Sequence, residues 1–386
     1  MADLFESLRL GGTVSLKNRI VMAPMTRTRT SEGDIPNMLM ATYYGQRSTA
    51  GLIVAEATDV APSSKGYALT PGIHTEDQKR NWRLVTDEVH RKKGTIFLQL
   101  WHVGRMAHPS LMPDGEAPWG VTEERAESEV FAHDEHGKLG FMRAGTPRRL
   151  PTEEVSGLVG TFSQAFADAR RAGFDGVEVH AANGYLFDQF MNSALNTRDD
   201  RYGGRTVEDR TRFLIEVVDE AVRQWGSGRV GVRLSPFGRF NSMPADPLVE
   251  ETLLYLAAQL GRCGVAYMHL VYQLMPDEGS METSDFVDRH LDHALLAKVR
   301  ASFPGAIIWC GGLTSRESAQ AALDTGLADL IAFGRPYVAN PDLTERLQHG
   351  WPLAEADRSS YYTRRGETGY TDFPVYAVQR GEPVKA

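Results

Sequence analysis

Short, uninterrupted apolar runs recur along the whole chain, with room for a helix between most of them. They are rich in valine, isoleucine and leucine and lie at 20–23, 51–55, 95–100, 176–179, 230–234, 265–270, 306–310 and 330–333. Strands with one face in water alternate apolar and polar residues, whereas continuous apolar runs suit strands covered on both faces, as in a parallel sheet. We therefore expect eight buried parallel strands.

The segments between these runs carry helical patterns. In 152–172 the apolar residues keep the spacing of one helix face, Thr152 is a candidate N-cap, and Glu153 and Glu154 suit the positive end of the helix dipole. Strands alternating with helices predict an α/β fold of the (β/α)₈ TIM-barrel type, with right-handed crossovers. A doubly wound parallel sheet is the alternative.

Polar residues and glycines gather where the predicted strands end. The positions are Pro24 to Thr26, Glu56, Ala57, Gln99 to His102, His180, Arg233, His269, Gly311, Gly312, Gly334 and Arg335. In a barrel they all face the C-terminal mouth, where barrel active sites lie. His180 ends the fourth run, and Asn183 and Tyr185 follow within five residues. Two hydrogen-bond donors and a phenol suit a site that holds and protonates an oxygen-bearing, electron-poor substrate.

Two segments are expected to cover that mouth. The connection 103–151 is long and rich in glycine, proline and charge, which predicts a lid with a short hairpin. The tail 351–386 carries an aromatic cluster and is predicted to pack back over the mouth. We expect residues 1–386 to form a single barrel domain.

Charge and composition exclude several classes of function. The net charge is −8 with no basic block, so nucleic acid is not an expected partner. The two cysteines, Cys263 and Cys310, exclude a disulfide framework, and His290, Asp292 and His293 lack a second ligand set for a metal. The N-terminus is not a signal peptide, and no apolar run approaches the roughly 18 residues of a membrane span. We expect a cytoplasmic protein with no membrane partner.

Two groups of candidate ligand-binding residues could instead have a purely structural role. Arg233 is either half of a buried ion pair with Glu56 or Glu178, or a fixed cation for a ligand that becomes anionic. Gly311, Gly312, Gly334 and Arg335 are either turn residues or a phosphate site, which barrels often place after their last two strands. The stretch 226–231 matches G-x-G-x-x-G, but it follows a helix and precedes a strand, so ordinary turn glycines explain it.

The chain also resembles the old yellow enzyme family, the FMN-dependent ene-reductases, in its classical branch. The resemblance covers about residues 2–376 and rests on separated motifs in family order: NRIVMAPMTRTR, KGYALTPGIHT, QLWHVGR, VEVHAANGYLFDQF, NTRDDRYGG, VRLSPFGRFN, IAFGRPYVANPDL and DRSSYY. Thr26 rather than cysteine places the chain in the classical branch. Asn183 stands where many bacterial members have histidine, and Met25 replaces a frequent leucine.

The resemblance implies a tightly but non-covalently bound FMN. Its ring would be lined by Pro24, Met25, Thr26, Ala57, Gln99 and Arg233, and its phosphate by Gly311, Gly312, Gly334 and Arg335. Arg233 would stabilise negative charge on the reduced ring.

By the same resemblance, NADPH or NADH would first reduce the flavin in a ping-pong cycle. An electrophilic alkene would then bind through its carbonyl oxygen to His180 and Asn183. Hydride would pass from flavin N5 to the β-carbon, and Tyr185 would give a proton to the α-carbon. The pocket would be shaped by Tyr67, Trp101, Phe240 and Tyr362.

Two other functions stay open from the residues. One is a metal-dependent barrel hydrolase using His180, His269 and Glu56, and the other is a flavin-binding protein without physiological turnover. The physiological substrate, nitro compounds included, the choice between NADPH and NADH, and the choice between monomer and homodimer are not readable from the sequence.

Overall fold

Eight parallel strands form a closed barrel in the computed structural model, which describes residues 2–271, 293–357, 361 and 366–376. In chain order they are β3 (Ile20–Met22), β4 (Leu52–Asp59), β5 (Ile96–Trp101), β10 (Gly176–Ala181), β11 (Val230–Leu234), β12 (Tyr267–Val271), β13 (Ala306–Cys310) and β14 (Leu330–Phe333). The TIM-barrel prediction is confirmed and the doubly wound sheet is excluded, because β14 pairs with β3 and closes the ring.

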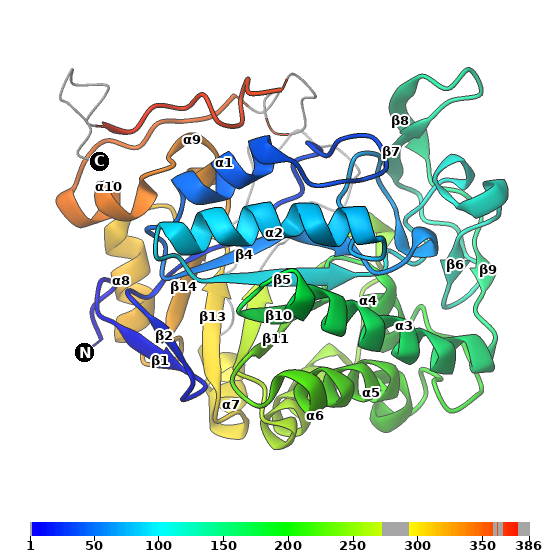
Figure 1. Ribbon diagram of the computed structural model, residues 1–386. Coiled ribbons are helices and arrows are strands. Elements are labelled where there is room, and N and C mark those ends of the chain that lie inside the picture. The colour runs from blue at the N-terminus through cyan, green and yellow to red at the C-terminus, as the bar shows by residue number, and fades with distance from the viewer. Residues whose placement is uncertain (1, 272–292, 358–360, 362–365, 377–386) are drawn as a thin grey trace.

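Helices surround the barrel and cover the outer faces of its strands (Figure 1). The longer ones are α1 (Met38–Gln46), α2 (Glu76–Arg91), α3 (Thr152–Arg171), α5 (Val207–Trp225), α6 (Val249–Cys263), α7 (His293–Ser302), α8 (Arg316–Asp324) and α10 (Leu343–His349). Short helices α4 (Leu186–Met191) and α9 (Arg335–Ala339) follow β10 and β14. The predicted Thr152 N-cap is wrong by one residue, because Pro151 is the N-cap and the Thr152 hydroxyl donates to Asp200 at 2.5 Å.

A small hairpin that the sequence did not reveal covers the N-terminal end of the barrel. It pairs β1 (Leu8–Leu10) with β2 (Val14–Leu16). Its turn lies against the glycine-rich stretch 226–231, where a Cβ on Gly11 would come 2.1 Å from the Gly228 Cα. These glycines therefore serve a close backbone approach at the end of the barrel opposite the mouth, which agrees with the turn reading of that motif.

The long connection after β5 contains an antiparallel hairpin of β7 (Glu129–His133) and β8 (Leu139–Arg143), which projects from the molecule (Figure 1). Around it lie the pair β6 (Trp119–Gly120) and β9 (Arg148–Arg149) and the 3₁₀ turns η2 (Pro109–Leu111) and η3 (Pro113–Gly115). No helix of the described residues is long and apolar enough to cross a membrane.

The described part of the tail runs beside α1, along the upper edge of Figure 1. The Arg27 guanidinium, just after β3, donates to the Gly369 carbonyl at 2.7 Å and to the Tyr43 hydroxyl at 2.9 Å. The rings of Tyr370 and Tyr43 stack with centroids 4.0 Å apart, and Tyr370 is fully buried. The Arg27 cation therefore attaches the tail to the loop after β3, and the ring stack attaches it to α1.

This attachment predicts a large stability loss on Tyr370→Ala, roughly 3–5 kcal/mol, because the ring is buried and its site cannot fully collapse. Tyr370→Phe is the matched control. The Tyr370 hydroxyl is buried without a hydrogen-bond partner among the described residues, so its removal is expected to leave stability unchanged or raise it. Denaturant unfolding measures both, and equal losses in the two variants would contradict the ring-stack argument.

Candidate active site

Strand register brings the predicted polar residues together at the barrel mouth. Gln99 on β5 pairs with Glu178 on β10, and one rung further His180, Arg233 and His269 are neighbours on β10, β11 and β12. Residues paired in this way point to the same side of a sheet, here into the barrel. The predicted site residues Gln99, His180 and Arg233 are thus more than fifty residues apart in the sequence, yet they lie on the neighbouring strands β5, β10 and β11.

A buried ion pair forms the floor of this site. Glu178 is fully buried, accepts from Gln99 Nε2 at 2.7 Å and lies 2.9 Å from His269 Nδ1. Burial opposes ionisation of the carboxyl, but the adjacent His269 outweighs it and lowers the pKa of Glu178. Burial likewise opposes protonation of His269, and Glu178 outweighs it and raises the pKa of the imidazole. Each group therefore favours the charged form of the other.

Arg233 has no carboxylate of its own. Neither Glu56 nor Glu178 lies within ion-pairing distance of it in the described structure, so that alternative is wrong. Its Nη2 contacts Cys310 Sγ at 4.0 Å, and its buried Nε has no hydrogen-bond partner among the described residues. A buried cation without an ion pair suits a ligand with an anionic edge.

The surroundings of His180 favour the neutral form of its imidazole. Burial, with Arg233 and His269 nearby, lowers the pKa of its imidazole well below the usual range. Its Nδ1 accepts from the Ala182 backbone N–H at 3.3 Å. The neutral tautomer consistent with that bond carries its proton on Nε2, which can then donate to a ligand oxygen.

Asn183 follows in a tight left-handed turn with φ of 60°, before Gly184 at 73°. Its backbone N–H donates to Ser235 Oγ at 2.7 Å, and its carbonyl accepts from Asn241 Nδ2 at 2.8 Å. The Ser235 hydroxyl donates in turn to Asp188 at 3.3 Å, and Asp188 also accepts from the Gly184 N–H at 2.7 Å. Bonds from the loop after β11, from η4 and from α4 therefore fix the backbone that carries the Asn183 side chain.

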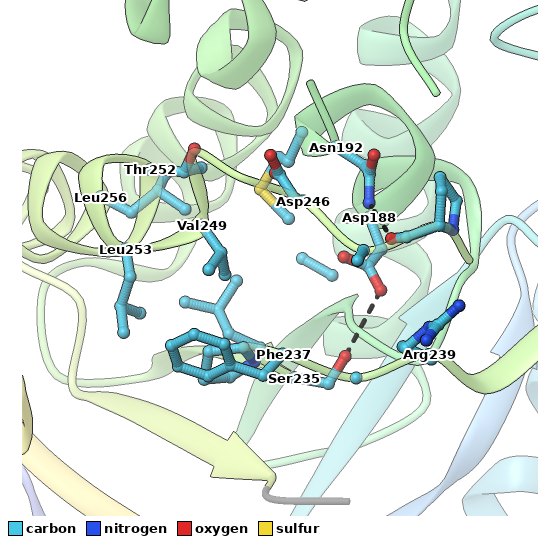
Figure 2. A pocket seen from close by; sticks show the side chains of 17 residues that line it. Asp188, Asn192, Ser235, Phe237, Arg239, Asp246, Val249, Thr252, Leu253 and Leu256 are labelled. Carbon is cyan, nitrogen blue, oxygen red and sulfur yellow. Dashed lines mark hydrogen bonds between the residues drawn. The ribbon is translucent and has the colours of Figure 1, made fainter. Parts of the chain in front are cut away.

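Asp188 and Ser235 also line a cavity of about 140 Å³ behind this turn. Figure 2 shows their hydrogen bond at one side of the cavity, with the apolar side chains of Val249 and Leu253 on helix α6 across from it. Burial raises the pKa of Asp188 to about 7. The support of Asn183 thus includes a carboxyl that is partly protonated at neutral pH.

An aromatic wall stands beside these donors. The Tyr185 ring meets Trp101 edge-on at 4.8 Å and His180 at 5.0 Å, and its hydroxyl lies 3.3 Å from that of Tyr67. Trp101 is stacked between Tyr67 and His180. The predicted Tyr67, Trp101, His180 and Tyr185 therefore form one contiguous surface.

The remaining cofactor candidates lie on the same rim. Pro24, Met25 and Thr26 follow β3, and Ala57 lies within β4 at a bulge rather than after the strand. Ala57 belongs to the same buried cluster as Trp101 and Tyr185.

The two strand-end turns are close to this rim. Gly311 and Gly312 have φ of 111° and 73°, values that favour glycine. A Cβ on Gly334 would lie 3.6 Å from Met25 Sδ, so the loops after β14 and β3 adjoin. Arg335 is exposed at the first residue of α9.

Phe240 lies in η4 (Phe240–Ser242), where its carbonyl oxygen closely approaches Gly184. Tyr362 lies outside the described residues, as do His290 and Asp292. Among the described residues no three His, Cys, Asp or Glu side chains group as metal ligands, and His180, His269 and Glu56 do not converge. Glu56 instead accepts from the Tyr44 hydroxyl and the Arg27 backbone N–H.

Several supporting residues were missed by sequence reasoning. Asp188 and Ser235 hold Asn183, and Asp59 holds Trp101 through its indole N–H at 2.7 Å. Asp188 lies in a helical pattern and Ser235 beside a proline, neither of which signals a site. Asp59 had a weak signal, since it lies only a few residues beyond the second apolar run.

The fold and this mouth define a TIM-barrel enzyme with one polar, aromatic-walled site at the C-terminal end. Residues 3–354 match the model of the NADH:flavin oxidoreductase / NADH oxidase family. The chain is 42% identical to 12-oxophytodienoate reductase 1 of Oryza sativa subsp. japonica, over 94% of this chain and 90% of the relative. It is 39% identical to a chanoclavine-I aldehyde reductase of Penicillium roqueforti, over 98% and 97% of the two chains.

Comparison with solved structures finds proteins of the same kind. Morphinone reductase superposes with a TM-score of 0.92 at 42% identity, over 100% of this chain and 99% of that one. An old yellow enzyme homologue from Zymomonas mobilis superposes with a TM-score of 0.87 at 35% identity, over 97% of this chain and 99% of that one. The chain belongs to the NADH:flavin oxidoreductase / NADH oxidase family, that of old yellow enzyme, and is an oxidoreductase.

The lowered pKa of His180 gives a direct prediction. Below its usual pKa of about 6.5 a solvent-exposed histidine is protonated, whereas His180 is expected to stay neutral from pH 8 to pH 6. Nitrogen-15 NMR of the imidazole, assigned with His180→Gln, should show an acceptor-type Nδ1 and a protonated Nε2 throughout. A titration step near pH 6.5 assigned to His180 would contradict the donor role.

Proposed function

We propose that the protein is an FMN-dependent NAD(P)H oxidoreductase that reduces the activated C=C bond of α,β-unsaturated carbonyl compounds. The observation that carries this proposal is that Arg233, a buried cation without an ion pair among the described residues, lies beside His180 at the strand ends where Asn183 and Tyr185 follow. Support also comes from relatives whose names describe reductases. A solved structure of morphinone reductase is a complex with tetrahydroNAD, which supports a nicotinamide as the reductant.

The residues present fit FMN. Arg233 Nε is buried with no partner among the described residues, and Gly311 and Gly312 have positive φ and no side chain to keep a ligand oxygen from the backbone. The ring would be held by Pro24, Met25, Thr26, Ala57, Gln99 and Arg233, and the phosphate by Gly311, Gly312, Gly334 and Arg335. Bound FMN would supply the hydride chemistry, and the protein supplies orientation and charge.

The donors and the phenol have separate tasks. His180 Nε2 and the Asn183 amide donate to the substrate carbonyl oxygen, which draws electron density from the conjugated double bond. Tyr185, whose hydroxyl lies beside that of Tyr67, gives the proton to the α-carbon. Tyr67, Trp101, Phe240 and, outside the described residues, Tyr362 shape the pocket. Nitro compounds fit the same donors.

The segment 103–151 acts as the lid of this pocket. Val130 and Ala132 of the β7–β8 hairpin are buried in the same cluster as Trp101 and Tyr185, and the Phe131 carbonyl accepts from the Ala68 N–H at 2.7 Å. The hairpin therefore packs directly against the substrate wall, which supports one barrel domain with an inserted lid.

The decisive experiment is a visible spectrum. The purified protein is expected to be yellow and to bleach anaerobically with NADPH or NADH. Arg233→Met is expected to slow bleaching at least ~100-fold, the usual cost of one lost charge-stabilising donor. Arg229→Met is the control, because Arg229 binds the Asp175 carbonyl at the opposite end of the same strand. A colourless wild type that takes up no FMN would refute the proposal, and colour without steady-state enone reduction would indicate a flavin-binding protein only.

Tyr185→Phe separates the two half-reactions. Loss of the proton donor is expected to slow reoxidation by 2-cyclohexenone about 10²-fold or more, within the usual range for general acids. Reduction by NADPH needs no such proton and should stay within about twofold of the wild type, which makes it the internal control. Stopped-flow absorbance measures both, and equal slowing of the two steps would remove Tyr185 from this role.

A further inference from the structure

A buried carboxylate stands behind the aromatic wall of the pocket. After its bulge β4 continues to Asp59, which is paired in register with Trp101 on β5. The Trp101 indole N–H donates to Asp59 Oδ1 at 2.7 Å, and the Thr70 hydroxyl donates to Oδ2 at 2.8 Å. Asp59 is 1% exposed, so each of its oxygens is held by one short bond inside the protein.

The orientation of Trp101 matters to every residue of the wall. Its ring lies within 18° of parallel to Tyr67 and within 17° of parallel to His180, with centroids 6.0 Å away in both cases. It also meets Tyr185 edge-on. The indole has one N–H, so an acceptor at that position selects one ring orientation over its flipped alternative.

The strength of this acceptor depends on its charge. Burial raises the pKa of Asp59 to about 7, with nearby Lys65 lowering it and Asp34 raising it. Lys65 forms an ion pair with Asp34 at 2.6 Å, so its charge does not stabilise the Asp59 carboxylate alone. Thr70 and Trp101 are the side-chain donors that favour the charged form. As pH rises through about 7 the carboxyl loses its proton and becomes a charge-assisted acceptor, roughly twice as strong as a neutral one.

We propose that Asp59 is a positioning residue that, through the indole N–H of Trp101, fixes the wall against which Tyr185 and the substrate pack. It touches neither substrate nor cofactor, and it sets substrate affinity through the orientation of Trp101. Because the bond is strongest when Asp59 is ionised, substrate affinity rises with pH across neutrality. This inference rests on the proposed function for the identity of the ligand.

The test compares two changes of similar size in the holoenzyme. Asp59→Leu removes the acceptor, whereas Asp59→Asn keeps an acceptor oxygen but cannot ionise. The probe is 2-cyclohexenone, which is neutral at every pH used, and its dissociation constant for the oxidised enzyme is measured by calorimetry. Asp59→Leu is expected to weaken binding about tenfold, in line with the loss of a buried hydrogen bond. Asp59→Asn should stay within about threefold at pH 7 and lose the pH dependence between 6 and 8 that the wild type shows.

Trp101→Phe tests whether Asp59 acts on substrate affinity through the indole N–H. It removes the donor, so adding Asp59→Leu to it should cause no further loss of affinity, whereas independent effects would add. The Trp101 indole N–H resonance, identified by its absence in Trp101→Phe, should shift in Asp59→Leu and move with a midpoint near pH 7 in the wild type. Asp168→Asn is the matched control, because Asp168 is equally buried but pairs with Arg171 and Lys79 on the outer helices.

Three outcomes would overturn the inference. They are an unchanged affinity for 2-cyclohexenone in Asp59→Leu, additive losses of affinity in the double variant, and a Trp101 indole N–H resonance that changes neither with the substitution nor with pH. If Asp59→Leu does not fold, the inference is tested by Asp59→Asn and by the pH dependence of substrate affinity. A wild type without FMN would refute the proposed function instead. The indole resonance would still report on the Asp59–Trp101 bond in that case, so the two failures are distinguishable.

Discussion

The site depends on the Arg233 guanidinium, which is buried in the barrel and has no ion-pair partner among the described residues. Removing a charge from water is costly unless another charge or a set of hydrogen bonds compensates for it. The buried Glu178, whose charge Arg233 also senses, is already held by His269 and Gln99. Arg233 therefore keeps positive potential at the mouth, and a ligand with an anionic edge would recover the desolvation cost. A Glu178–Arg233 pair in the same barrel would have neutralised it.

The same positive potential explains why His180 can serve as a neutral donor. Burial alone disfavours the imidazolium, and the neighbouring Arg233 and His269 lower the pKa of His180 further. The floor of the mouth is thus charged while its wall is not. This division suits a reaction in which charge develops at the cofactor edge and the substrate oxygen needs only hydrogen bonds.

Much of this arrangement was predictable because strand position alone decides which residues share the mouth. The eight apolar runs mark the barrel strands to within a few residues, and His180, Arg233 and the glycines after β13 follow from them. Strands β1 and β2 were missed because each has only three residues, too few to show a periodic pattern of apolar and polar positions. Asp59 was missed because β4 runs through a bulge past its apolar run, and Asp188 because its partner Ser235 comes from another loop. Contacts between distant loops have no local signature in a single sequence.

The turn at Asn183 shows where the fold accepts strain to position a donor. A left-handed backbone at a residue with a side chain costs roughly 1–2 kcal/mol, and the following Gly184 is also left-handed. The turn ends β10 abruptly and starts α4 two residues later, so His180, Asn183 and Tyr185 follow one another within six residues at the end of the strand. Bonds from Asn183 to Ser235 and Asn241, and from Gly184 to Asp188, offset that cost. Since they come from β11's loop, from η4 and from α4, the strained conformation persists only while the barrel is assembled, which makes the substrate-binding geometry a property of the complete fold.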